Sequence, residues 1–255
     1  MKTLLLIFIL FPFYIFAQKT IHVYVALCDN QFQGIVPVPE KIGNGKDPFN
    51  NLYWGTAYGV KTFFKRSKNW TLVKTYKNPE AHVLERCLFK HNTKDVFLLA
   101  EAYDGEYIKE CTSDFLKTMF SMNSLTIEYE DRKLLFAKDA DLISYIGHNG
   151  LMDFDLDQND YVLLSGKDKE VIILACISQA YFESFIKRTC ANPLVLTAQL
   201  MAPEAYTLEA GIEAWLKNKT NEEVRIEAAK AYAKYQKCSM YGAKKILVTG
   251  FEDYD

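Results

Sequence analysis

The chain has 255 residues and a formal net charge of −2, with 30 Lys and Arg residues against 32 Asp and Glu residues. The basic residues are spread along the chain, so neither nucleic acid nor an anionic membrane surface is indicated as a partner. This length is sufficient for one large domain with a single core.

The amino-terminal segment has the pattern of a secretory signal peptide. Lys2 precedes an apolar stretch over residues 4–16, which is short for a bilayer span, and Ala17 is a small residue at the expected cleavage point. The alternative is an uncleaved amino-terminal anchor. We therefore expect a signal peptide over 1–17 and a single domain over 18–255, in an exported protein, periplasmic or secreted, with no membrane contact after cleavage. Its six cysteines are compatible with one or two disulfides.

The first half of the mature chain predicts two strands and two helices. A β-branched and apolar run from Lys19 to about Cys28 indicates a buried strand, and the Pro- and Gly-rich stretch 33–51 indicates a long loop. Apolar and aromatic residues at helical spacing follow over 51–66, although two glycines weaken a regular helix there. Residues 94–103 then predict a strand and 107–120 a helix.

The second half continues this alternation. Residues 125–137 indicate a β-hairpin or a strand and turn, and two apolar strands follow, the first ending before His148 and the second at Cys176. The next segment carries an apolar helical face, and residues 193–199 predict a further strand. Two helices, starting near residues 203 and 221, close the chain. Strands alternating with helices predict an α/β fold with a doubly wound, mainly parallel sheet covered by helices on both faces.

Two chemically reactive side chains stand at predicted strand ends. In such sheets functional groups collect at the carboxyl ends of the strands, and the 28 positions between His148 and Cys176 leave room for one crossover between neighbouring parallel strands. A histidine can take the proton of a thiol and return it to a leaving amine, and a helix starting after Cys176 would favour the thiolate. Gly150, and alternatively Gly147, would let a backbone amide approach a substrate carbonyl as part of an oxyanion hole.

The stretches "DLISYIGHNG" and "VIILAC" together resemble the caspase, legumain and gingipain clan of cysteine peptidases, clan CD. That clan places one apolar strand before a His-Gly and the next before an Ala-Cys. The resemblance implies a caspase-like fold, a catalytic dyad of His148 and Cys176 and an oxyanion glycine at Gly150, and "CIS" is similar to the Cys-x-Ser of some metacaspases. Asn149 is a departure, because the clan has Gly directly after His. The whole chain also resembles uncharacterised exported bacterial proteins.

The resemblance implies endopeptidase action on a protein or peptide, with a preference for one residue before the cut. Asp29 and Asp153 are candidates to line a substrate pocket for a basic side chain, and the alternative is that each is a solvated loop carboxylate. A catalytically inactive caspase-like domain that binds a protein or peptide is the rival hypothesis, and a structural domain with a disulfide-bonded Cys176 is a third.

No cofactor or metal site is expected. "GNGK" at Gly43 lacks the spacing of a phosphate-binding loop, and the acidic stretch from Asp153 fails the EF-hand pattern at Gln158 and Leu164. The remaining three histidines have no metal-ligand spacing.

Overall fold

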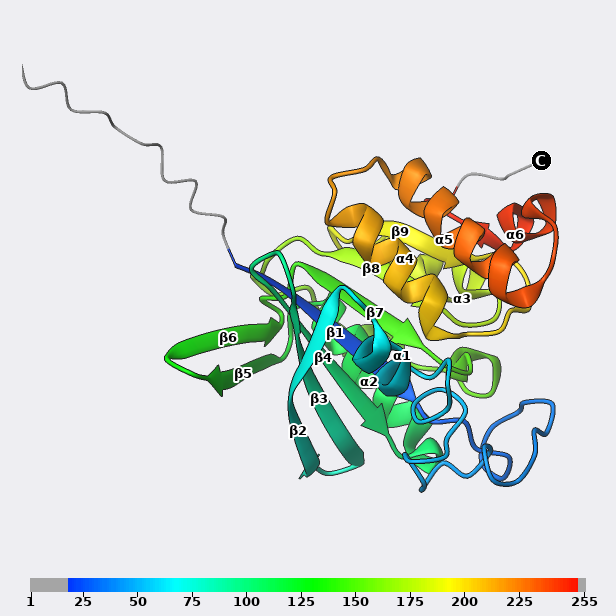
Figure 1. The fold of residues 1–255 in the computed structure, drawn as a ribbon, viewed down its shortest axis with the longest axis horizontal. Helices are drawn as coiled ribbons and strands as arrows, with labels where there is room; N and C mark the ends of the chain where they lie inside the picture. The colour runs from blue at the N-terminus through cyan, green and yellow to red at the C-terminus, as the bar shows by residue number, and fades with distance from the viewer. Residues whose placement is uncertain (1–17, 252–255) are drawn as a thin grey trace, which may run out of the picture.

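A mostly parallel sheet runs through residues 18–251, the part of the chain that the computed structural model describes (Figure 1). Within that part its eight strands have the order β10-β9-β8-β7-β1-β4-β3-β2. The strands are β1 (Lys19–Ala26), β2 (Trp70–Glu80), β3 (Val83–His91), β4 (Val96–Tyr103), β7 (Leu142–Ile146), β8 (Glu170–Leu174), β9 (Asn192–Thr197) and β10 (Leu247–Val248). Strands β1, β4, β7, β8 and β9 pair in parallel, whereas β2, β3 and β10 form antiparallel margins. The predicted α/β class with a mainly parallel sheet is confirmed.

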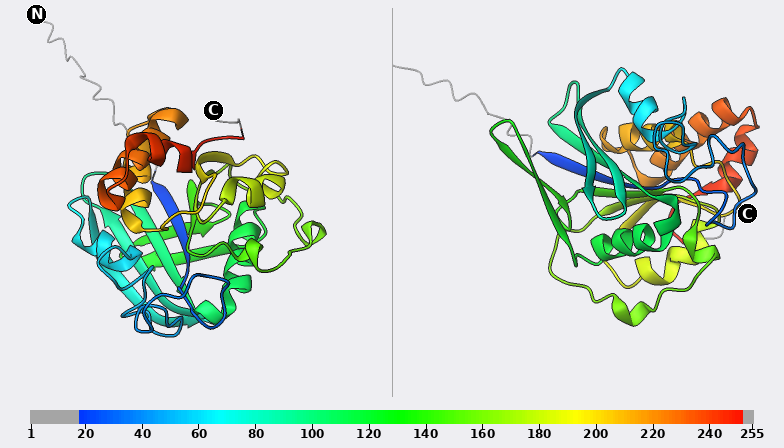
Figure 2. Two further views of the ribbon diagram at one scale, coloured as in Figure 1. Left: turned by 90° about the vertical axis from the view of Figure 1, so that its right-hand side faces the viewer. Right: turned by 90° about the horizontal axis from the view of Figure 1, so that it is seen from below.

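Helices cover both faces of this sheet, as the views in Figures 1 and 2 show. One face carries α1 (Val60–Arg66), α4 (Ala205–Trp215) and α5 (Asn221–Gln236), while α2 (Ile108–Met119) and α3 (Ser178–Ile186) lie against the other. A short α6 (Met240–Ile246) packs beside α5.

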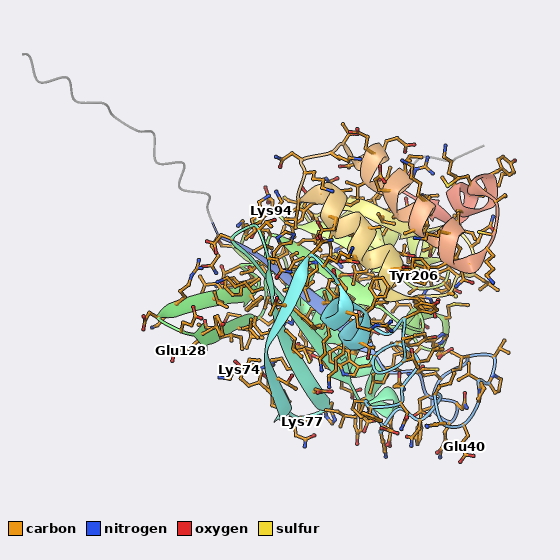
Figure 3. All side chains as sticks on the ribbon, in the orientation of Figure 1. Glu40, Lys74, Lys77, Lys94, Glu128 and Tyr206 are labelled. Carbon is orange, nitrogen blue, oxygen red and sulfur yellow. The ribbon has the colours of Figure 1, made fainter. Side chains whose placement is uncertain are left out.

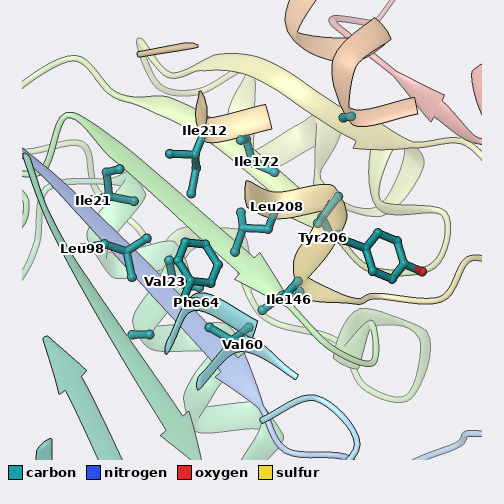
Figure 4. Close-up of a cluster of buried hydrophobic side chains, with 14 of the residues drawn as sticks. Ile21, Val23, Val60, Phe64, Leu98, Ile146, Ile172, Tyr206, Leu208 and Ile212 are labelled. Carbon is teal, nitrogen blue, oxygen red and sulfur yellow. The ribbon is translucent and has the colours of Figure 1, made fainter. Parts of the chain in front are cut away.

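Strand β1 shows how the sequence produces these two layers. Its residues Ile21, Val23 and Val25 belong to the core under α1, α4 and α5, of which Figure 4 shows a part. The intervening Tyr24 and Ala26 belong to the core under α2 and α3. A strand buried on both faces needs a nearly continuous apolar run, and β1 has one.

The strands β5 (Ser124–Tyr129) and β6 (Arg132–Ala137) form a hairpin that projects from one side of the molecule (Figure 1). Of the two structures that the sequence left open here, a hairpin or a strand and turn, the hairpin is the one that forms. Its inward residues Leu134 and Phe136 pack with Phe97 and Leu99 of β4 in a third, smaller core. Charged side chains such as Lys74, on the marginal strand β2, extend outward at the rim (Figure 3).

Three predictions of local structure need correction. Helix α1 begins only at Val60, because residues 51–59 form tight turns in which a Cβ on Gly55 would lie 1.9 Å from the Phe49 carbonyl oxygen. The antiparallel strands β2 and β3 were not predicted, and exposed positions interrupt the pattern of β2. Helix α6 and strand β10 extend the chain beyond the two helices expected at its end.

All six cysteines lie in the described range and are free thiols, so the structure contains none of the disulfides with which the composition was compatible. The predicted signal peptide, residues 1–17, lies outside the described residues. Across 18–251, no helix combines the length and the apolar character needed to cross a membrane.

The strand order reverses beside β1, which has β4 on one side and β7 on the other. At such a reversal the loops that follow the strands diverge and leave a crevice at the carboxyl edge of the sheet. The loops after β1, β7 and β8 therefore meet at the same edge.

Candidate functional site

The pairing of β7 with β8 brings His148 and Cys176 to equivalent positions. The register places Leu142 opposite Glu170 and Ile146 opposite Leu174, and the Gly147 amide donates to the Leu174 carbonyl at 3.2 Å. His148 and Cys176 each follow the last pair by two residues, so both stand at the carboxyl ends of adjacent strands, which run about 4.8 Å apart. The two residues thus share one edge of the sheet, although no hydrogen bond joins imidazole to thiol among the described residues.

Gly147 gives the chain its turn before the histidine. Its φ of +145° is a conformation that residues with a side chain rarely adopt, and a Cβ there would lie 2.7 Å from the Ala26 carbonyl oxygen of β1. Only glycine allows β7 to leave the sheet so close to β1.

Asn149 ties the histidine loop to the cysteine loop. Its fully buried side chain donates from Nδ2 to the Cys176 carbonyl at 2.7 Å, and its Oδ1 accepts from the Leu151 amide at 3.1 Å. The second bond caps the short 3₁₀ turn Gly150–Met152. One side chain therefore fixes both loops relative to each other.

His148 is 6% exposed and has a carboxylate partner. Its Nε2 lies 2.7 Å from Oδ2 of Asp153, and that oxygen also accepts from the Gly34 amide at 2.9 Å. Within residues 18–251, Nδ1 of His148 has no hydrogen-bond partner. Asp153, predicted to line a substrate pocket, thus lies against the imidazole, where it sets the orientation of the ring.

Cys176 is half-buried under the chain that follows β9. Its Sγ accepts from the Met201 amide at 3.4 Å and lies 3.6 Å from the Met201 carbonyl oxygen. The next residue, Ile177, has φ +52° and ψ +36°, which is a strained left-handed conformation for a β-branched residue. The Ile177 amide donates to the Gln199 carbonyl at 3.1 Å, so this turn is held from the side of β9.

Helix α3 begins directly after this turn, at Ser178. The Ser178 hydroxyl donates to the Ile173 carbonyl at 2.9 Å, and the Ser178 amide donates to Oγ1 of Thr197 at 3.0 Å. The serine that resembles the metacaspase pattern is therefore a buried brace between β8, α3 and β9. The amino end of α3, which carries a partial positive charge, therefore begins two residues after Cys176.

Gly150 is buried beside Tyr145. Burial raises the pKa of Tyr145 well above its usual range, and a hydrogen bond from the Gly150 amide to the phenol acts in the opposite direction. The Tyr145 hydroxyl itself donates to the His148 carbonyl at 2.8 Å. By contrast, the backbone amides of Asn149 and Cys176 donate no hydrogen bond within residues 18–251.

Asp29 organises the loop after β1. Its side chain is almost fully buried, and its carboxylate accepts from the amides of Gln31 at 2.7 Å, Phe32 at 3.1 Å and Gly45 at 3.1 Å. These bonds occupy both oxygens, so the predicted substrate-binding carboxylate is engaged by its own loop.

Two aromatic residues adjoin the thiol. Burial raises the pKa of both Tyr53 and Tyr232, and the proximity of Cys176 contributes to each increase. Cavities of about 600 and 640 Å³ lie elsewhere, beside α1 and along α2, and neither is lined by His148 or Cys176.

Sequence reasoning missed the roles of Asn149, Ile177 and Met201. An Asn before a Gly at a strand end does predict a side-chain turn, which is what Asn149 makes with Leu151. Nothing in the sequence indicates that Met201 covers the thiol, because this contact spans 25 residues and depends on the path after β9.

No group of three or more His, Cys, Asp or Glu residues in the described part of the chain is arranged to hold a metal ion. Comparison with known proteins found no matching family model, no matching curated protein and no matching solved structure.

Proposed function

We propose that this protein is an exported cysteine-type hydrolase of peptide or related amide bonds, with Cys176 as the nucleophile and His148 as the general base and acid. The observation that carries this proposal is the parallel pairing of β7 with β8, which brings the loops of His148 and Cys176 to one edge of the sheet, together with the Asn149 bond that links these loops. A thiol and an imidazole at one sheet edge are the minimum equipment for acyl transfer through a thioester.

The hydrogen bond to Asp153 defines the part that the imidazole plays. The carboxylate holds a proton on Nε2, which leaves the lone pair of His148 on the unpaired Nδ1. That nitrogen takes the thiol proton as Cys176 attacks the substrate carbonyl carbon. The proton then passes to the leaving amine, and water, deprotonated by the same nitrogen, hydrolyses the thioester.

The negative charge that develops on the substrate oxygen needs backbone donors. We assign them to the amides of Asn149 and Cys176, which are unpaired within residues 18–251. Gly150, the predicted donor, is the next residue along the loop and lies beside the Tyr145 hydroxyl. A Cβ on Gly150 would also lie 2.5 Å from the Phe154 ring, so the packing of this ring by itself explains why position 150 is a glycine.

The strand order supports the resemblance to the caspase-like clan. His148 follows the third parallel strand in chain order and Cys176 the fourth, which is the order that the resemblance implied. Asn149 stands where the clan has glycine, and its φ of −80° is accessible to any residue. In this proposal Asp29 holds its own loop and Asp153 orients the imidazole. Neither contacts a basic side chain of the substrate.

One observation favours the alternative, a catalytically inactive caspase-like domain that binds a protein or peptide. The backbone of Met201 contacts the Cys176 sulfur through both its amide and its carbonyl, which limits the approach of a substrate. An inactive domain has no need for a reactive thiolate at this position.

Iodoacetamide labelling across a pH series, with each cysteine followed by mass spectrometry, separates the two functions. The exposed Cys190 and Cys238 are internal references for an ordinary thiol. The hydrolase predicts that Cys176 reacts at lower pH than these two and that His148→Ala abolishes this difference. Labelling of Cys176 that is slower than the references at every pH, or that is indifferent to His148→Ala, would favour the binding domain.

A further inference from the structure

A second cluster of reactive groups lies at the opposite edge of the sheet, before β8 and β9. It surrounds a cavity of about 150 Å³ between the end of α2 and the segment that leads into β8. The cavity is lined by both Ser121 and Lys169, and neither takes part in the proposed cysteine chemistry.

Lys169 is a buried amine without an acidic partner. It is 3% exposed, and its Nζ donates to Oγ of Ser121 at 2.9 Å and to the Lys167 carbonyl at 2.7 Å. No carboxylate forms an ion pair with it among the described residues. Burial lowers the pKa of Lys169 to about 8, with Asp139 and Asp168 acting in the opposite direction and Lys167 in the same one.

Ser121 lies just after the end of α2. Its left-handed backbone, with φ +61°, closes the helix, with the Ser121 amide donating to the Thr118 carbonyl at 3.0 Å and the Met122 amide to the Lys117 carbonyl at 2.8 Å. This turn holds the hydroxyl against Lys169. The Ser121 hydroxyl lies so close to Gly166 that a Cβ on Gly166 would be 2.2 Å from Oγ. Glycine at position 166 therefore lets this loop pack directly against the hydroxyl, and a side chain there would displace it.

The loop on the other side of the cavity supplies free backbone donors. Within residues 18–251, the amides of Ser165 and Gly166 donate no hydrogen bond, and both residues line the cavity. Unpaired amides beside a hydroxyl and an amine complete the set of groups that acyl transfer requires.

We propose that Ser121 and Lys169 form a second hydrolytic site, a serine–lysine pair that acts on esters of short acyl groups. The neutral amine of Lys169 takes the hydroxyl proton as the Ser121 oxygen attacks the ester carbonyl carbon. The resulting ammonium returns the proton to the departing alkoxide. Water then attacks the acyl-serine ester, its proton passes to the amine, and the carboxylic acid is released as the Ser121 hydroxyl is restored.

The size of the cavity sets the substrate class. Its volume of about 150 Å³ is well below the roughly 300 Å³ at which pockets for drug-sized ligands begin. We therefore assign short acyl groups, from acetyl to butyryl, as the substrate class.

The test uses the full chain with Cys176→Ala, so that the outcome does not depend on the cysteine site. A small alkyl fluorophosphonate is the covalent probe, its adduct is located by mass spectrometry, and hydrolysis of p-nitrophenyl acetate is compared with that of the octanoate. We expect the adduct on Ser121, acetate turnover that rises as pH passes about 8, and little octanoate turnover. An adduct elsewhere, or a labelling rate of Ser121 that does not change between pH 6.5 and 9.5, overturns the proposal.

Matched variants locate the chemistry. Ser121→Gly removes the hydroxyl while accepting the left-handed backbone, and Lys169→Met removes the amine but keeps an apolar side chain of similar length. Each is expected to lower acetate turnover by about 100-fold or more. Ser184→Ala, exposed on α3, and Lys187→Gln, exposed just after that helix, are expected to leave it unchanged. If Lys169→Met does not fold, Ser121→Gly and the pH dependence of wild-type labelling still decide. Retention of turnover in Ser121→Gly refutes the site.

Discussion

Substitution of Asn149 by alanine tests whether one side chain holds the histidine and cysteine loops together. The change removes the bond to the Cys176 carbonyl and the cap on the Leu151 amide. Each hydrogen bond contributes about 1 kcal/mol, and the partners left behind are shielded from water, so we expect the free energy of unfolding to fall by about 2 to 3 kcal/mol. For a domain of this size, that corresponds to a decrease in Tm of about 4 to 12 °C.

Asn149→Asp separates the two bonds. Aspartate keeps an acceptor for the Leu151 amide but places a carboxylate oxygen against the Cys176 carbonyl oxygen, so its cost should exceed that of Asn149→Ala. Asn159→Ala is the matched control, because that side chain is exposed in the loop between β7 and β8. Surface substitutions of this kind usually change stability by less than about 0.5 kcal/mol.

Two measurements check this prediction, urea unfolding for stability and iodoacetamide labelling for the position of the thiol. In Asn149→Ala the thiol is no longer held opposite the imidazole, so the labelling rate of Cys176 should approach that of the exposed Cys190. If Asn149→Ala unfolds at the wild-type urea concentration and labels Cys176 at the wild-type rate, the reasoning about this bond is refuted.

Three further predictions concern other parts of the chain. Asp153→Asn should slow alkylation of Cys176 at neutral pH by at least about tenfold, because the His148 ring loses the carboxylate that orients it. An unchanged alkylation rate would contradict this role of Asp153. Gly147→Ala should lower the free energy of unfolding, measured by urea denaturation, by about 2 to 4 kcal/mol, because the new Cβ meets the Ala26 carbonyl oxygen of β1. Gly250→Ala is the control, since no atom lies within 4 Å of its new Cβ, and it should lower this free energy by about 1 kcal/mol. Equal decreases in the two variants would refute the clash with β1. Since burial lowers the pKa of Lys169 from 10.5 to about 8, the unfolded chain binds more protons between these pH values. Stability relative to Lys169→Met should therefore rise by about 2 to 3 kcal/mol from pH 8 to 10.5, and parallel stability curves would show that this pKa is unshifted.

The sequence by itself predicted the fold class and the two strand ends that carry His148 and Cys176. The strands that form the middle of the sheet are short and apolar, and the segment after Cys176 has the spacing of an amphipathic helix. Such patterns follow from local periodicity, which a single sequence displays directly. The 28-residue spacing of His148 and Cys176 equals the offset with which β7 pairs with β8 in parallel, so the two residues follow adjacent strand ends.

Tertiary structure decided the rest. The antiparallel pair β2 and β3 depends on pairing with β4, and its exposed positions give no continuous apolar run from which a strand could be predicted. The partners of Asp29 and Asp153 came from loop geometry, so carboxylates that looked available for a substrate proved to be bonded to the Gly45 amide and the His148 ring. The cover that Met201 places over Cys176 and the contact of Ser121 with Lys169 join residues 25 and 48 positions apart. Contacts of this kind are fixed by how the layers pack, and neither periodicity nor motif spacing contains that information.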